Sequence, residues 1–121
     1  MTGPSEDRRT LRDYLNVPYV VESTSIEIAP GVWTRRVRYP ELPDCAAEHE
    51  IIETAIRMLE RQRIQTIIRM LCNGKLPPHP RSRLAHSDPS WTAKEAGLDH
   101  VVLDLFDKTV AELCGIPDPF A

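Results

Sequence analysis

The stretch that decides the fold is EIIETAIRMLERQRIQTIIRMLC, residues 50–72. Its apolar residues recur at the spacing of three and four residues that is typical of an amphipathic helix. They form two successive sets, which are Ile52, Ala55, Ile56 and Leu59, and then Ile64, Ile67, Ile68 and Leu71. At about 100° per residue, the second set is centred about a third of a turn away from the first. We therefore predict one long helix whose N-terminal half packs on a sheet, while its C-terminal half is covered by a later helix or by another chain.

The residues that precede this helix predict a sheet. Residues 19–28 are rich in β-forming side chains, and the Pro30-Gly31 pair is a turn signal. Residues 32–39 alternate in the manner of a returning strand. A short third strand is expected at 45–47. The fold class is therefore α+β, with a three-stranded antiparallel sheet packed by one long helix and followed by a C-terminal helix.

Local signals also place the remaining boundaries. Asn73-Gly74 is typical of a helix end, and the proline-rich residues 77–90 predict a linker. Residues 92–95 have the spacing of a capping box, and a final helix is expected over about 99–113, with a short one over 10–15. The predicted organisation is an N-terminal segment at 1–17, a β-β-β-α module at 18–76, the linker, and a C-terminal helical extension at 91–121.

An interaction surface is expected on the second apolar set of the long helix. If no later helix covers this set, it is open to a partner together with the apolar stripe of the last helix. The candidate partner-binding residues are Ile64, Ile67, Ile68, Leu71, Leu105 and Phe106. An edge strand in so small a sheet also favours self-association, so we expect a homodimer or a higher oligomer.

Composition excludes several classes of protein. The chain has 121 residues, 41% of them apolar and 27% charged, with a formal charge of −3, so it has enough apolar residues for a folded core. No apolar run approaches the ~18 residues of a membrane span, and the N-terminus has no signal-peptide pattern. We expect a cytoplasmic protein. The three cysteines show neither a disulfide framework nor metal-ligand spacing, so they are interpreted as small buried residues.

The charge is unevenly distributed. Residues 51–83 carry seven basic side chains and two acidic ones, a local charge of +5 between two acidic ends. The helix contributes Arg57, Arg61, Arg63 and Arg69, which are the candidates for nucleic-acid binding. They point in different directions around the helix, and no aromatic residue lies among them to stack a base. The simpler expectation is a solvated helix face, or pairing with the acidic C-terminal end of the same chain.

No motif predicts catalysis or a cofactor. The four histidines lack ligand spacing, and the chain contains neither a nucleophile elbow nor a glycine-rich phosphate loop. If the protein were a small enzyme, Cys45 and His49 would be its candidates. We expect no metal, no cofactor and no enzymatic activity.

The segment from Tyr19 to Pro80 resembles the HicB-like antitoxin fold family. That family has a hairpin ending in Pro-Glu-Leu-Pro-Gly-Cys, a short strand, a Gly-Asp-Thr, a helix that opens with Glu-Glu-Ala, and then a glycine and prolines. The corresponding residues here are Pro40, Glu41, Leu42, Pro43 and Cys45, followed by Glu53 and Ala55 in the helix, with Gly74 and Pro77 at its end. Asp44, His49 and Ile51 depart from the pattern.

The resemblance implies a partial ferredoxin-like fold and a role as an antitoxin that covers the active surface of a small HicA-type ribonuclease. The departures also leave room for an adaptor or subunit of another assembly. A non-catalytic interaction module is therefore our leading hypothesis. A nucleic-acid-binding regulatory protein that uses residues 51–83 is the alternative.

Overall fold

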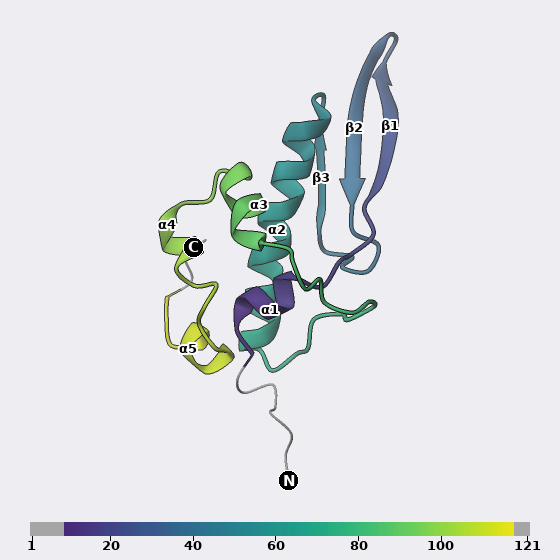
Figure 1. Cartoon of the computed structure of the whole chain (residues 1–121). Coiled ribbons are helices and arrows are strands. Elements are labelled where there is room, and N and C mark those ends of the chain that lie inside the picture. Colours follow the sequence, from purple (N-terminus) through teal and green to yellow (C-terminus); the bar gives the residue numbers. More distant parts are fainter. Residues whose placement is uncertain (1–8, 118–121) are drawn as a thin grey trace.

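The computed structural model describes residues 9–117 and has the predicted α+β architecture, with a three-stranded sheet against one long helix (Figure 1). Its elements, in chain order, are α1 (Leu11–Leu15), β1 (Glu22–Ala29), β2 (Val32–Arg38), β3 (Ala46–His49), α2 (Ile52–Cys72), α3 (Pro89–Glu95), α4 (His100–Leu103) and α5 (Val110–Cys114). The expected hairpin, third strand and long helix are confirmed. A short helix over residues 10–15 is also confirmed as α1 with Thr10 as its N-cap.

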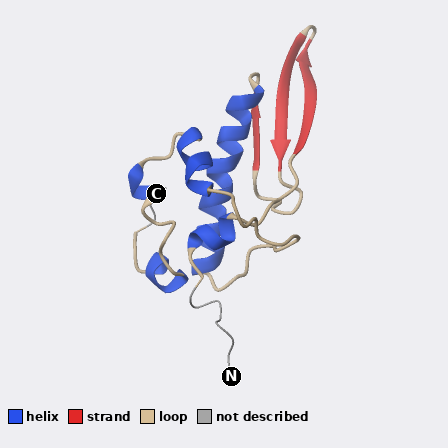
Figure 2. Ribbon diagram, viewed as in Figure 1, coloured by secondary structure: helices blue, strands red, loops and turns tan. Residues whose placement is uncertain are grey.

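The sheet is antiparallel with the order β1-β2-β3, so β2 is central and β1 and β3 are its edges (Figure 2). The turn between β1 and β2 uses Gly31 at φ +75°, a conformation that favours glycine. Val37 pairs with Ser23 on one side and with Ala47 on the other, which fixes the register. The register shifts near the tip of the hairpin, between Glu27 and Ala29.

The two apolar sets of α2 are covered by different layers. The N-terminal half of the helix packs on β2 and β3, where Val37, Ala47, Ala55 and Leu59 are buried. The second set is covered by α1, α3 and α5, so the later helices of the same chain supply the cover that the sequence requires. One cluster of buried residues includes side chains of both layers.

The C-terminal half of the chain differs from expectation in two places. The helix predicted over 99–113 is split into α4 and α5, because the carbonyls of Phe106 and Lys108 accept hydrogen bonds from Arg12 and Leu11, at 2.8 and 3.1 Å. The first N–H groups of a helix lack intrahelical partners, and α1 takes these carbonyls to satisfy them. The chain between α4 and α5 is thereby held as turns.

The capping box predicted at 92–95 is also wrong. Asp88 is the N-cap of α3, its side chain accepts from the Ser90 N–H at 3.0 Å, and Pro89 is the first helical residue. This is the usual arrangement of a capping acid followed by proline, and it places Thr92 inside the helix. The linker is therefore shorter than expected at its C-terminal end.

Cysteine pairing corrects the sequence interpretation. Cys72 at the end of α2 forms a disulfide with Cys114 at the end of α5, with their Cα atoms 5.2 Å apart, and both residues are exposed. The third cysteine, Cys45, is fully buried, as predicted. A sequence separation of 42 residues gave no signal of this bond, because it depends on where the two helix ends meet.

A buried ion pair connects α2 to both layers. Glu60 and Arg63 are 5% and 7% exposed and hydrogen-bond to each other one helical turn apart. Glu60 accepts from the hydroxyl of Tyr39, the residue after β2, at 2.9 Å, and Arg63 donates to the Leu15 carbonyl of α1 at 3.2 Å. Burial lowers the pKa of Arg63, but the charge and hydrogen bonds of Glu60 together with the effects of Tyr39 and Tyr19 outweigh it, so that pKa is raised.

Loss of the disulfide is expected to destabilise the protein. Closing a loop with a separation of 42 residues stabilises the folded state by about 4 kcal/mol in the chain-entropy model. Urea unfolding of Cys72→Ser/Cys114→Ser should show a free energy of unfolding lower by about 2–4 kcal/mol. Adding a reductant should bring the natural protein to the same stability and leave the variant unchanged. Equal stability of the natural protein with and without reductant would contradict the bond.

Replacing one residue of the buried pair should lower the free energy of unfolding more than replacing both. Arg63→Met leaves the Glu60 carboxylate buried without its cation and should lower the free energy of unfolding by about 3–5 kcal/mol. In Glu60→Met/Arg63→Met no buried charge remains, so the double variant should be clearly more stable than the sum of the two single losses. Urea unfolding of all four proteins makes the comparison, and strict additivity would show that the pair is not coupled.

Candidate functional site

The outer strand β1 is exposed over nearly its whole length. Every residue of β1 except Ile26 is exposed, although β1 is hydrogen-bonded to β2 along one edge. α2 lies against β2 and β3, and β1 stands on the far side of β2 (Figures 1 and 2). An exposed edge strand presents a row of backbone donors and acceptors that a further strand can use. β1 therefore offers a pairing edge eight residues long.

Apolar side chains gather along this strand and at the end of its hairpin. Trp33 is 50% exposed and Ile28 59% exposed, although both belong to regular strands. The other large apolar residues exposed on this hairpin and just before it are Val20, Val21 and Val32. Trp33 shares its face of β2 with the buried Val37 but lies nearer the tip of the hairpin. We call β1 and these five side chains the hairpin surface.

Charged side chains of the hairpin form pairs within the sheet. Arg38 contacts Glu22 at 2.7 Å across the β1–β2 pair, and Arg36 contacts Glu48 of β3 at 3.4 Å. Arg35 donates to the Ser25 hydroxyl. Such exposed pairs contribute little stability. They do leave the apolar side chains and the open backbone edge as the hairpin's main means of contact with a partner.

Glu41, from the motif that resembles the antitoxin family, anchors the start of β1. It accepts a hydrogen bond from the Val20 N–H at 2.7 Å and forms an ion pair with Arg81 at 2.8 Å. The backbone hydrogen bond from Val20, with help from Arg81, lowers the pKa of this carboxyl group. The residue therefore ties together the entry to β1, the β2–β3 turn and the linker.

The other motif residues have structural positions too. Leu42, Cys45 and Ala55 are buried, whereas Pro43 is exposed and Pro40 is half-buried. Glu53 lies in the first turn of α2, where an acid suits the helix dipole, as predicted. The motif thus shapes the turn out of the hairpin and its contact with α2.

The two candidate catalytic residues are not brought together. Cys45 precedes β3 and His49 ends it, which places them about 13 Å apart along the strand. The Cys45 thiol is buried and donates to Thr66 Oγ1 at 3.4 Å, and burial raises its pKa. His49 Nδ1 accepts from the Ile51 N–H at 3.0 Å. Both side chains are occupied in holding β3 and its exit turn.

The four candidate nucleic-acid-binding arginines do not form one surface. Arg57, Arg61 and Arg69 are exposed on α2, whereas Arg63 is buried against Glu60. Ion pairs also involve the linker and the C-terminal acids. Outside α2, Arg81 pairs with Glu41 and Arg83 with Asp13, while the C-terminal acids Asp88 and Asp107 pair with Arg12.

The apolar candidate residues for partner binding lie in the core. All six are less than 9% exposed: Ile64, Ile67, Ile68, Leu71, Leu105 and Phe106. The expectation that they form an open surface is wrong for this structure, because α1, α3 and α5 cover this side of α2. The signal for the hairpin surface was present instead in Glu22, Ser23, Thr24 and Ser25, a run of polar residues on both faces of one strand.

Residues 9–117 lack the features of two other classes of site. No group of three or more His, Cys, Asp or Glu side chains is placed to hold a metal ion in this part of the chain. No helix among the described residues is long and apolar enough to cross a membrane.

Comparison of the chain with protein-family models, with curated proteins and with solved structures found no match.

Proposed function

We propose that this protein is a non-catalytic protein-interaction module that binds its partner through the hairpin surface. The observation that carries the proposal is the exposure of β1, an edge strand with no helix over it. Addition of a partner strand to a free sheet edge is a common mode of recognition, in which the backbone gives affinity and the side chains give specificity. Trp33 and Ile28 are the large side chains that a partner would bury.

The resemblance of residues 19–80 to the HicB-like antitoxin family suggests the kind of partner. A small HicA-type ribonuclease would be blocked by this module, or another subunit would be held by it in a different assembly. The formal charge of −3 favours a basic partner of this kind. In the absence of the partner, two copies associate through the same edge as a homodimer, so self-association and partner binding exclude each other.

A cytoplasmic location is part of the proposal, and it changes the interpretation of the disulfide. Disulfides are rare in most cytosolic proteins, and those that occur there are mainly catalytic or redox-sensing. In that compartment the Cys72–Cys114 bond would respond to the thiol balance of the cell.

The exposed arginines of α2 support a second candidate function. Arg57, Arg61 and Arg69 lie on the solvent side of the helix, outside the buried pair. A regulatory protein that binds RNA or DNA would use them as phosphate contacts, which position a nucleic acid without reading its sequence.

Lysine substitutions should separate the hairpin surface from the rest of the molecule. Val21→Lys/Ile28→Lys places two charges on exposed positions beside the edge, where lysine opposes strand pairing. We expect self-association, measured by light scattering, and co-purification with a co-expressed HicA-type ribonuclease both to weaken by about tenfold or more. Thermal unfolding should change little, because both side chains are exposed.

Leu76→Lys is the matched control, since Leu76 is 61% exposed but lies after α2. It should leave both associations unchanged. A natural protein that is monomeric at micromolar concentration and fails to bind the ribonuclease would rule out the proposal. Equal effects of the control and the hairpin variant would place the contact elsewhere.

Salt dependence tests the second candidate. If three arginines neutralise phosphates, the logarithm of RNA affinity should fall against the logarithm of salt concentration with a slope of about −2. Fluorescence anisotropy should show this slope lost in Arg57→Ala/Arg61→Ala/Arg69→Ala and kept in the control Lys94→Ala. No binding of RNA or DNA at low salt would exclude this function.

A further inference from the structure

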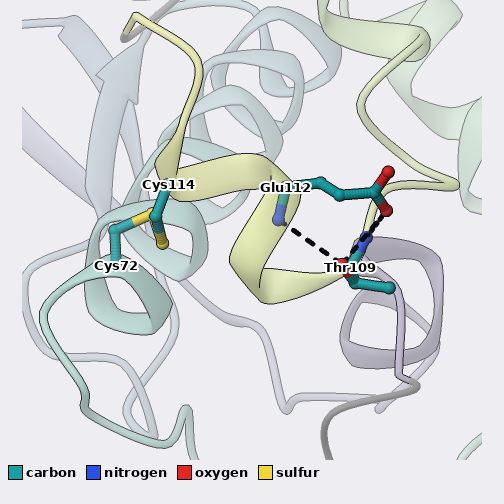
Figure 3. Close-up of a disulfide and its surroundings, with 4 residues drawn as sticks. All are labelled: Cys72, Thr109, Glu112 and Cys114. Carbon is teal, nitrogen blue, oxygen red and sulfur yellow. Dashed lines mark hydrogen bonds between the residues drawn. A yellow bond between two sulfur atoms is a disulfide. The ribbon is translucent and has the colours of Figure 1, made fainter.

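Residues 108–109 are attached to α1, whereas α5, which follows them, has fewer attachments. Thr109 pairs with Thr10, and the Lys108 carbonyl accepts from Leu11, so the chain is fixed to α1 up to this point. Beyond it, α5 is only five residues long, and its capping box joins Thr109 to Glu112 within the helix itself. Figure 3 shows this box beside the disulfide that joins the end of α5 to the end of α2.

Apolar packing under α5 is incomplete. Leu113 is buried, but a cavity of about 150 Å³ lies next to it, between α2 and the end of the chain. The residues lining this cavity include Ile68, Leu105, Leu113, Ile116 and both bonded cysteines. A cavity of this size deprives its lining of contacts, which weakens the hold of the side chains on α5. A helix of five residues has little stability of its own. The disulfide is therefore the covalent attachment of α5 to α2, beside the packing of Leu113.

The bond is also open to attack by thiols. Both Cys72 and Cys114 are exposed, and exposed disulfides are the labile and regulatory ones. Cys45 is fully buried and hydrogen-bonded to Thr66, so it is poorly placed for disulfide exchange with Cys72 and Cys114. Reduction and oxidation should therefore act on this one pair without scrambling the third cysteine.

We propose that Cys72–Cys114 is a redox-sensitive latch that closes α5 over the C-terminal half of α2. A small dithiol reductant opens it. One thiolate of the reductant attacks a sulfur of the bond, the S–S bond breaks, and the electron pair goes to the other cysteine, which takes up a proton. The second thiol of the reductant then displaces the first cysteine, which is also protonated. The protein gains two thiols and the reductant becomes a disulfide.

Opening of the latch is local. Residues 110–117 leave α2 and expose the apolar lining of the cavity, including Ile68 and Leu105, while the attachment of Lys108 and Thr109 to α1 holds the preceding chain. The residues that the sequence suggested as a partner-binding face thus become partly accessible only in the reduced protein. The latch is independent of the hairpin surface, which lies on β1 and β2.

Hydrogen exchange followed by mass spectrometry tests this proposal on the full chain. Oxidised protein should be about 2 Da lighter than reduced protein and should have one thiol, which reacts with an alkylating reagent only after unfolding. Dithiothreitol should raise the exchange rates of residues 110–114 by about tenfold or more beyond any rise in β2 and the first half of α2, whose protection falls only with the global free energy of unfolding. Cys72→Ser/Cys114→Ser should show the reduced pattern with or without dithiothreitol.

Cys45→Ser is the matched control, because it removes a cysteine and leaves the latch, so its exchange at 110–114 should still respond to dithiothreitol. The proposal is overturned if oxidised protein has three reactive thiols, or if reduction leaves residues 110–114 as protected as before. It is also overturned if reduction raises exchange in β2 and α2 as much as in residues 110–114, since α5 would then open only when the whole fold opens. A failure of the hairpin-surface experiments would leave each of these outcomes unchanged.

Discussion

The buried pair of Glu60 and Arg63 lies where α2 passes from one apolar set to the next. Before it, Ala55 and Leu59 face the sheet, and after it Ile64 and Ile67 face the other helices. The two polar side chains connect the layers directly, because Glu60 accepts from Tyr39 at the end of β2 and Arg63 donates to Leu15 of α1. A rotation of the apolar stripe requires such a crossing point, and a charge buried there is tolerated only when it is paired and hydrogen-bonded.

The width of α2 explains why β1 remains uncovered. A helix is about 10 Å across with its side chains, and neighbouring strands are about 4.8 Å apart, so one helix covers about two strands. The hydrogen bond from Tyr39 to Glu60 and the packing of α2 on β3 place the helix over β2 and β3. The remaining strand, β1, is left with its outer edge open, and its run of polar residues keeps it compatible with water. The hairpin surface is thus a consequence of a three-stranded sheet packed by a single helix, whether or not a partner uses it.

Sequence reasoning succeeded where periodicity extends over several turns or along a hairpin, as in α2 and in the β1–β2 pair. It failed for the helix expected over 99–113, because hydrogen bonds to the first N–H groups of α1 compete with helix continuation at Phe106 and Lys108. Those groups are 94 and 97 residues away in sequence, so no local pattern reveals them. The disulfide and the burial of Arg63 could not be predicted from the sequence for the same reason, since each depends on which elements meet in space.

The attachment of the linker accounts for part of the local charge of +5, because two of the seven basic side chains of residues 51–83 form ion pairs there. Residues 79–88 are all exposed, so apolar burial cannot fix their position. They are held by polar contacts instead: Arg81 binds Glu41, Arg83 binds Asp13, and the Leu84 N–H donates to the Asn16 carbonyl at 2.9 Å. A guanidinium group suits this use, because several donors in a rigid plane fix a geometry that a single apolar contact does not. Arg12 joins Asp88 and Asp107 in the same way. Three arginines, Arg12, Arg81 and Arg83, therefore hold the exposed linker and its neighbours in place.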